Sequence, residues 1–296
     1  MKAAKGKSNR IHHDRVFPAV NAIFLILLMF VTLYPVLNTV AYSFNDGTDA
    51  LRGNIGLWPR VFSLESYKSI LSDKAVYQAA WISGSKTVLI TLLNLFWTSM
   101  LAYCLSRKEF VLRRFITVIM VLTMYVNAGL IPNYLLIQKL GMLDKPIVLI
   151  LPYCLSVYNM IIMRSFFYGI PDSLRESAEI DGASFLRILW SVYLPLSKPV
   201  LATLALFYAV GRWNGYSDAL MYVKKPEYYP LQLLLYNVLK NINSVEVATQ
   251  EGFSMPGLSD SLKAAIVMFS TIPILCIYPF LQKYFVKGVM IGSVKG

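Results

Sequence analysis

The sequence predicts an all-α, polytopic membrane protein with six transmembrane helices. Hydrophobic residues make up 56% of the 296 residues and charged residues only 15%, whereas a soluble domain of this size carries more charge on its surface. The apolar residues also form runs of about 20, which is the length that a helix needs to cross a bilayer. We interpret these runs as helices because a span in lipid must satisfy its backbone hydrogen bonds internally. The expected spans lie within residues 16–45, 75–106, 115–138, 146–163, 199–217 and 264–282.

The placement of charge predicts the orientation of the chain. Although the net charge is +12, many of the basic residues gather in the short segments 1–15, 107–114, 164–198 and 283–295. Cytoplasmic loops carry such an excess of Lys and Arg, so we expect both termini inside the cell and no nucleic-acid partner. The first apolar run is much longer than the core of a signal peptide, and we expect it to remain as an anchor.

The remaining segments follow from these spans and the loops between them. After the first span, Leu64, Tyr67, Ile70 and Leu71 recur at helical spacing and predict a short helix on the outer surface. The predicted segments are a cytoplasmic tail (1–15), the first transmembrane helix (16–44), an external segment (45–74), a core (75–285) with a cytoplasmic element at 171–199 and an external loop at 223–263, and a C-terminal cytoplasmic tail (286–296).

The cytoplasmic element between the fourth and fifth spans predicts two short helices joined at a glycine. Ser173 and Glu176 have the spacing of a capping box, so we expect the first helix to run from Leu174 to Asp181. Gly182 can adopt the left-handed conformation that closes a helix. The joint between the two helices is therefore expected at Gly182.

The second helix of this element is expected to begin after Ser184, as its N-cap, and to run to Leu194, where Pro195 stops it. A first helix of about eight residues is too short to be stable alone. It must pack either against its own chain or into a groove on a partner. Glu176 acts as a cap, with or without a partner contact, whereas Glu179 has no capping role and is the better candidate for an Arg or Lys of a partner.

Two basic residues lie inside apolar runs. Arg212 either faces water or a partner, or extends its charge to the outer surface, because a charge at bilayer depth is costly. Lys86 lies near the outer start of the second span, and we expect its charge to reach the surface. Most aromatic residues after Arg212 are expected to form the interfacial belt of a membrane protein.

No catalytic or metal-binding residues are predicted. The run from Gly84 to Thr87 has the Lys-Thr end of a phosphate-binding loop, but it lacks the glycine before the lysine and lies in a span. The three cysteines, Cys104, Cys154 and Cys276, fall inside spans and share no motif spacing. ATP hydrolysis is therefore not expected of this chain.

Three segments resemble a known family. Residues 176–183 (Glu-Ser-Ala-Glu-Ile-Asp-Gly-Ala), followed by Leu194-Pro195, resemble the EAA loop of ABC-importer permeases, with Ser177 where the family has alanine. The end of the chain, 282–296, is similar to the tail of the carbohydrate branch, and Arg212-Trp213-Asn214 fits that branch. Within it, the chain resembles the maltose-type second permease subunit and the bacterial permeases of oligosaccharides and polysaccharide fragments.

This resemblance implies a type I ABC importer permease fold in a bacterial cell membrane and a set of partners. These are a second permease subunit in a heterodimer, two cytoplasmic ATPase subunits that bind ATP and Mg, and an extracytoplasmic sugar-binding protein. The substrate would be an oligosaccharide, and external basic residues such as Arg52, Arg60, Lys224 and Lys225 are compatible with an acidic one. The chain itself would need no cofactor.

The resemblance also implies roles for particular residues. Two other classes of protein remain as alternatives to an importer permease: a secondary sugar transporter or channel that acts alone, and a membrane-anchored structural or receptor subunit. The implied residues are Glu176, Ser177, Ala178, Glu179, Asp181, Gly182 and Ala183 for coupling to the ATPase, Arg212, Trp213 and Asn214 for the substrate pathway, and Gln250, Glu251, Gly252 and Phe253 for contact with the binding protein.

Overall fold

The computed structural model describes residues 8–240 and 259–293, and the side chains of 17–240 and 259–279. The described part is helical, and its only strand-like pairing is an isolated bridge between Asn45 and Phe62. The predicted contact residues 250–253 lie outside the described residues. The chain divides into two units, 1–72 with 256–269 and 73–255 with 270–296.

The first unit contains a long apolar helix followed by a small folded segment, residues 45–72. In α1 (Ser8–Ser43), which begins within the range predicted as a tail, the apolar side chains from Phe17 to Leu37 are exposed. A helix is confirmed at the predicted place, as α3 (Glu65–Ser72), where Ile70 is buried and Leu71 is exposed; its position on the outer surface stays a prediction. The remaining helical parts of this unit are α2 (Gly47–Ala50) and the first turns of α14 (Asp260–Ser293).

Polar contacts hold the folded segment 45–72 of this unit together. Asn38 donates to the carbonyl oxygens of Ile55 and Gly56 at 2.7 and 2.8 Å. Arg60, which the sequence predicted to be external, donates to the Asp49 carboxylate at 3.1 Å, so this cation already has an acidic partner in its own chain.

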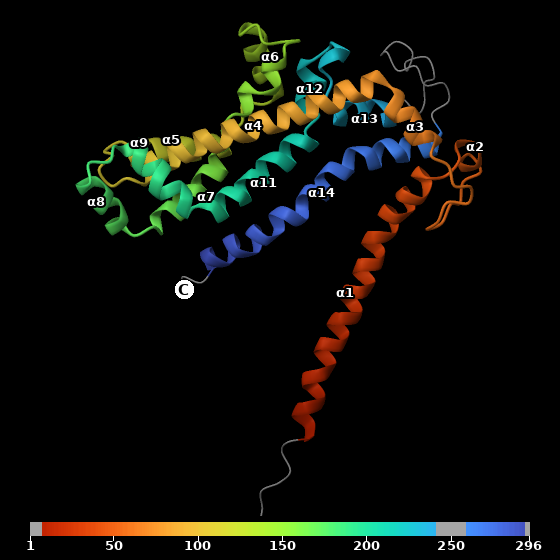
Figure 1. The fold of residues 1–296 in the computed structure, drawn as a ribbon, viewed down its shortest axis with the longest axis horizontal. Helices are drawn as coiled ribbons and strands as arrows, with labels where there is room; N and C mark the ends of the chain where they lie inside the picture. The colour runs from red at the N-terminus through yellow and green to blue at the C-terminus, as the bar shows by residue number, and fades with distance from the viewer. Residues whose placement is uncertain (1–7, 241–258, 294–296) are drawn as a thin grey trace, which may run out of the picture. The chain divides into compact units, whose positions relative to one another are not determined.

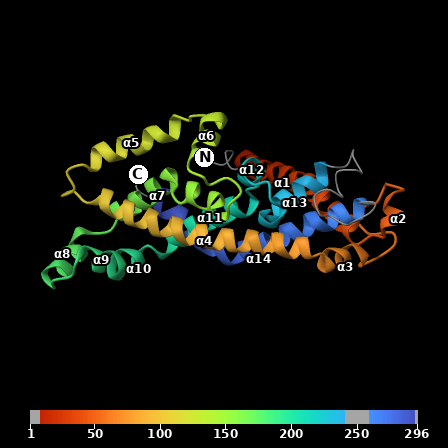
Figure 2. The ribbon, with the colours of Figure 1, turned by 90° about the horizontal axis from the view of Figure 1, so that it is seen from above.

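The second unit is built around α4 (Lys74–Ser106), a helix of 33 residues that begins at Asp73, whose carboxylate accepts from the Ala75 amide at 2.8 Å. Its closest packing partners are α7 and α11. Figure 1 shows α8 and α9 near one end of α4 and α13 near the other. In Figure 2, α5 and α6 lie on one side of α4, and α9 and α10 lie on the other. The other elements of this unit are α5 (Arg113–Tyr125), α6 (Leu130–Lys139), η1 (Pro146–Leu149), η2 (Leu151–Tyr153), α7 (Val157–Tyr168), α8 (Asp172–Ile180), α9 (Phe185–Ile188), the π-helical η3 (Leu189–Tyr193), α10 (Leu194–Leu196), α11 (Lys198–Asn214), α12 (Ser217–Tyr222), η4 (Pro226–Tyr228) and α13 (Leu231–Lys240).

The number of spans agrees with the prediction only when bent helices are counted as one span. Among the described residues, three helices are long and apolar enough to cross a membrane unbroken, and three bent pairs raise the number to as many as six. The predicted third span is not straight: α5 and α6 are bent by 116°, with Gly129 at a φ of 88° in the break. The bend at the fourth span is 42°, and the bend between α10 and α11 is 85°.

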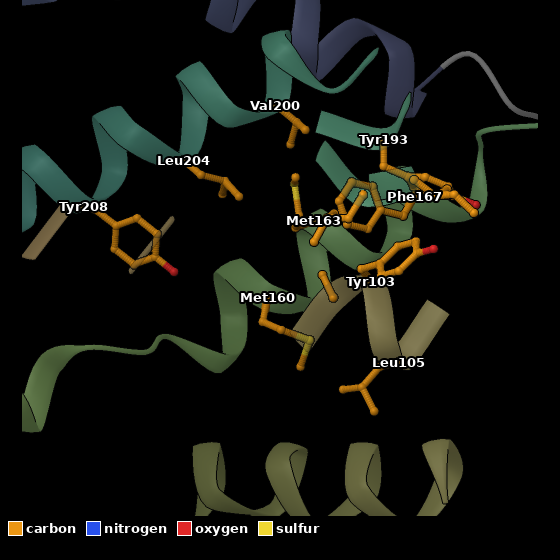
Figure 3. Close-up of a cluster of buried hydrophobic side chains, with 12 residues drawn as sticks. Tyr103, Leu105, Met160, Met163, Phe167, Tyr193, Val200, Leu204 and Tyr208 are labelled. Atoms are coloured by element: carbon orange, nitrogen blue, oxygen red, sulfur yellow. The ribbon is translucent and has the colours of Figure 1, made fainter. Parts of the chain in front are cut away.

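A buried core joins α4, α7, η3 and α11 (Figure 3). Three aromatic rings form its centre: Tyr103 lies 4.9 Å from Tyr193 and 6.4 Å from Phe167, and Phe167 lies 5.2 Å from Tyr193, all edge to face. Such aromatic pairs each add about 1 kcal/mol to the energy of burial. This core fixes the end of α4 against which the element at 171–199 packs.

Candidate functional site

The cytoplasmic element forms the predicted joint. Gly182 has a φ of 73°, in the left-handed region, directly after α8. Its amide donates to the Glu179 carbonyl oxygen at 3.0 Å, and the next amide, of Ala183, donates to Ala178 at 2.9 Å. These bonds satisfy carbonyl groups at the end of α8, as expected of a glycine-closed helix. Ser184 then accepts from the Arg187 amide at 3.4 Å, so the predicted N-cap of the second helix is also confirmed.

The predicted capping box is wrong. α8 begins at Asp172, with Pro171 at the N-cap position and no side-chain cap bond. Ser173 therefore lies inside the helix, and Glu176 does not occupy the third helical position that a capping box requires. An acidic Asp172 in the first turn suits the positive end of the helix dipole, and its carboxylate accepts from Lys108 at 3.1 Å.

The predicted stop at Pro195 is also wrong. The helix continues to Leu196 and turns by 85° into α11 at Ser197. A π-helical segment, Leu189–Tyr193, ends two residues before the proline. Its wider turn changes the hydrogen-bond register ahead of a residue that has no amide hydrogen to donate, so the proline is accommodated inside the helical run.

Glu179 binds arginines of its own chain rather than remaining open for a partner. Its carboxylate accepts from Arg107 at 2.7 Å and from Arg175 at 3.1 Å. Glu109 pairs with the same two arginines, at 3.4 and 3.2 Å. The arginine side chains are only 11% and 13% exposed, against 34% for Glu179. The hydrogen bond from Arg107 holds the pKa of Glu179 below its ordinary value, so the carboxylate is charged at neutral pH.

This four-residue network docks α8 against the end of α4. Ala178 and Ala183 add apolar contact by packing against the buried core. The short helix was expected to pack either against its own chain or into a groove on a partner. The structure shows that it packs against its own chain. Glu176 is 62% exposed, and its nearest charge is Arg175 at 3.7 Å.

The element exposes several large apolar side chains. Ile180 is 86% exposed and Phe185 is 66% exposed, although each lies next to the docked part of the element. Leu174 and Leu186 are exposed as well. Sequence reasoning placed Leu174 at the start of the first helix and did not single out Ile180, Phe185 or Leu186. The signal for the others was their position, because large apolar residues flank the Asp181-Gly182 joint in an otherwise polar stretch.

A second group of charges is buried toward the other end of α4. The Lys86 ammonium donates to the Gly215 carbonyl oxygen at 3.0 Å and lies 3.9 Å from Asp218. The Lys86 and Asp218 side chains are 3% and 4% exposed, so the prediction that the Lys86 charge reaches the surface is wrong. Arg212 lies 4.0 Å from the same carboxylate and 4.3 Å from the centre of the Tyr153 ring.

This buried charge cluster, defined as Lys86, Arg212 and Asp218, joins α4, α11 and α12. Neither carboxylate oxygen of Asp218 has a hydrogen bond within the described structure. Sequence reasoning missed Asp218, because the residue follows the predicted fifth span and carries no motif. Two cations and one anion leave the cluster with one positive charge in excess.

The three residues predicted for the pathway have different surroundings. Trp213 donates its indole hydrogen to the Ser270 carbonyl oxygen on α14 at 2.9 Å, which ties α11 to that helix. Asn214 is the last residue of α11 and is exposed. Arg212 belongs to the buried charge cluster. The structure therefore does not bring these three side chains to one site.

A family model, described as binding-protein-dependent transport system inner membrane component, matches residues 94–291. The chain belongs to this family. The matched range contains the cytoplasmic element, Arg212 and Asp218. This permease is thus a membrane-embedded transport component and not an enzyme.

Relatives of this permease match over almost its whole length. It is 37% identical to the polygalacturonan/rhamnogalacturonan transport system permease protein YtcP of Bacillus subtilis, over 96% of this chain and 99% of that protein. It is 38% identical to protein LplC of the same organism, over 95% of this chain and 96% of that one. A crystal structure of a bacterial ABC transporter involved in the import of the acidic polysaccharide alginate matches with a TM-score of 0.85 and 33% identity, over 96% of this chain and 100% of the other. The permease therefore shares the fold of an ABC importer subunit, as the sequence predicted.

Proposed function

We propose that this chain is the membrane-spanning subunit of an ATP-driven importer of oligosaccharides that contain uronate units. The substrate is delivered by an extracytoplasmic binding protein, and the energy comes from cytoplasmic ATPase subunits that bind ATP and Mg. The observation that carries the coupling role is the exposed apolar side of the cytoplasmic element. A group of exposed large apolar side chains marks a surface that a partner covers, and Leu174, Ile180, Phe185 and Leu186 form such a group around the joint.

The coupling mechanism follows from how the element is held. The ion pairs Glu179–Arg107 and Arg175–Glu109 dock α8 on the chain, so a partner that binds Ile180 and Phe185 moves a rigid body and not a loose loop. Closure of two ATPase subunits would then shift α8 together with the end of α4. Such rigid-body motion changes access to the pathway from one side of the membrane to the other.

The proposed assembly contains two permease subunits, two ATPase subunits and one binding protein. The second permease subunit would cover part of the apolar surface that this chain leaves exposed, which includes most of α1. Both termini of this chain would lie in the cytoplasm of the bacterial cell, in agreement with the concentration of Lys and Arg near the cytoplasmic element. The segment 250–253 remains the proposed contact with the binding protein.

The charge of the substrate is inferred from two observations. Polygalacturonan, rhamnogalacturonan and alginate, which the names of the relatives contain, all include uronates. The buried charge cluster has one positive charge in excess, and Arg212 is its least buried cation, at 25% exposed. A cation in a region of low dielectric attracts a carboxylate more strongly than it does in water.

The coupling proposal predicts the effect of a charge on the exposed apolar side. In proteoliposomes that contain the full assembly, Ile180→Asp is expected to reduce ATPase stimulation by the loaded binding protein about tenfold or more, because an unpaired carboxylate would be buried against the partner. Ile180→Leu is the matched control and should retain stimulation. Normal coupling in Ile180→Asp would contradict the proposal, and uptake driven by an ion gradient without ATPase subunits would favour a transporter that acts alone.

The substrate proposal makes a separate prediction. Uptake of a labelled oligogalacturonide by the assembly is expected to be inhibited by unlabelled oligogalacturonides and not by neutral oligosaccharides of equal length. Reduction of the uronate carboxyl groups to alcohols should remove the inhibition. Equal inhibition by charged and neutral sugars would contradict the uronate preference and leave the coupling role intact.

A further inference from the structure

A basic hollow lies where the end of α4, the start of α5 and the end of α7 meet. It is an open cavity of about 500 Å³. No carboxylate lines it. Its polar lining consists of four cations and two hydroxyl groups, from Lys108, Arg113, Arg114, Arg164, Thr117 and Tyr168.

Arg164 is the fixed cation of this hollow. It donates to the Leu105 carbonyl oxygen at 3.0 Å, to the Thr117 hydroxyl at 3.1 Å and to the Tyr168 hydroxyl at 2.8 Å. All three acceptors are uncharged, so the guanidinium group is held in place without being neutralised. The hydrogen bonds come from α4, α5 and α7, which makes the position of this charge a property of the fold.

The other cations are also poorly neutralised. The Arg113 guanidinium has one long hydrogen bond, to the Arg107 carbonyl oxygen at 3.4 Å, and the Arg114 side chain has no ion pair or hydrogen bond within the described structure. Lys108 pairs with Asp172 at 3.1 Å, but both side chains are exposed, and exposed pairs contribute little. The hollow thus presents several positive charges that the chain itself does not balance.

An apolar surface begins at the edge of this hollow. Val118 lines the hollow and is exposed, and Phe115 and Leu122 are exposed on the same side of α5, three and four residues away. Cations next to an exposed apolar helix face match both parts of a phospholipid, namely an anionic headgroup and an acyl chain. A free anion or an acidic peptide would use only the charged part.

We propose that this hollow binds the phosphate headgroup of an anionic phospholipid in the cytoplasmic leaflet, with an acyl chain along the exposed side of α5. Basic pockets between membrane helices on the cytoplasmic side bind such headgroups. The site is separate from the coupling surface and from the buried charge cluster, so it does not depend on which sugar is carried. The leaflet follows from the proposed orientation of the chain.

The test uses the purified full-length chain in a mild detergent. Native mass spectrometry measures bound dioleoylphosphatidylglycerol and dioleoylphosphatidylcholine, each with and without sodium phosphate. The variant Arg113→Gln/Arg114→Gln removes two cations of the hollow but keeps Arg164, which the fold needs. The control Arg187→Gln/Lys198→Gln removes two exposed cations from α9 and α11, outside the hollow.

The expected result is tighter binding of phosphatidylglycerol than of phosphatidylcholine. Loss of two arginines should weaken phosphatidylglycerol binding roughly 30-fold, because each cation near an anionic lipid contributes about fivefold. The control variant should bind like the wild type. Equal affinity for the two lipids, or an equal loss in both variants, would overturn the proposal. Binding of phosphate with no preference between the lipids would assign the hollow to a free anion and overturn it as well.

Discussion

Asp218→Asn is expected to lower the stability of the permease by about 3–5 kcal/mol, the cost of removing one partner from a buried ion pair. The substitution keeps the shape of the side chain but leaves Lys86 and Arg212 without a counter-charge. Lys86 would retain only the Gly215 carbonyl oxygen at 3.0 Å. The measurement is the melting temperature and the yield of monodisperse protein in detergent.

The charge balance of the cluster predicts that removing the anion and removing one cation lower the stability by different amounts. A general packing effect would not produce this difference. Lys86→Met leaves one cation, Arg212, against one anion, so its loss of stability should be smaller than that of Asp218→Asn. In the double variant Lys86→Met/Asp218→Asn, the loss should be smaller than the sum of the single losses. An additive double variant, or a greater loss in Lys86→Met than in Asp218→Asn, would show that the three charges do not stabilise one another.

Gly182→Val is expected to reduce ATP-driven uptake about tenfold or more without preventing membrane insertion. A side chain at this position would meet no atom within 4 Å, so space is not the constraint. The constraint is the φ of 73°, which a β-branched residue adopts only as an outlier. Valine would therefore shift the chain between α8 and α9 and displace the exposed side chains Ile180 and Phe185 from each other.

A matched substitution separates backbone conformation from side-chain size. Asparagine tolerates the left-handed region far better than valine, so Gly182→Asn should retain most of the uptake. The two variants are compared in proteoliposomes with the same ATPase subunits and binding protein. If both variants lose uptake equally, the effect comes from the side chain and not from the backbone, and the argument from φ is wrong.

The fold class and the long spans could be predicted because hydropathy and end signals agree for them. The second span was expected at 75–106, and α4 extends from Lys74 to Ser106. The break between α5 and α6 could not be predicted from the same signal, because apolar residues continue on both sides of it. Gly129 and Pro132 were the local indications, and both residue types also occur in unbroken membrane helices.

The site was predicted less completely, and the reason differs between residues. The joint at Gly182 depends on local backbone conformation, which the sequence encodes directly. The partners of Glu179 and Lys86 are distant in the sequence: Arg107 is 72 positions from Glu179, and Gly215 is 129 positions from Lys86. Composition and spacing contain no information on such pairs, so an in-chain partner was assigned to neither residue.

The packing of α4 has a mechanical consequence. Near its start this helix holds the buried charge cluster through Lys86, and just beyond its end Arg107 holds α8 through Glu179. The stretch between these two residues is about 30 Å long at the helical rise, close to the thickness of the hydrocarbon layer. It contains neither glycine nor proline, the usual causes of a kink. A displacement of α8 therefore has no hinge along α4 to absorb it, and the helix would act as a stiff rod that moves Lys86 relative to Asp218.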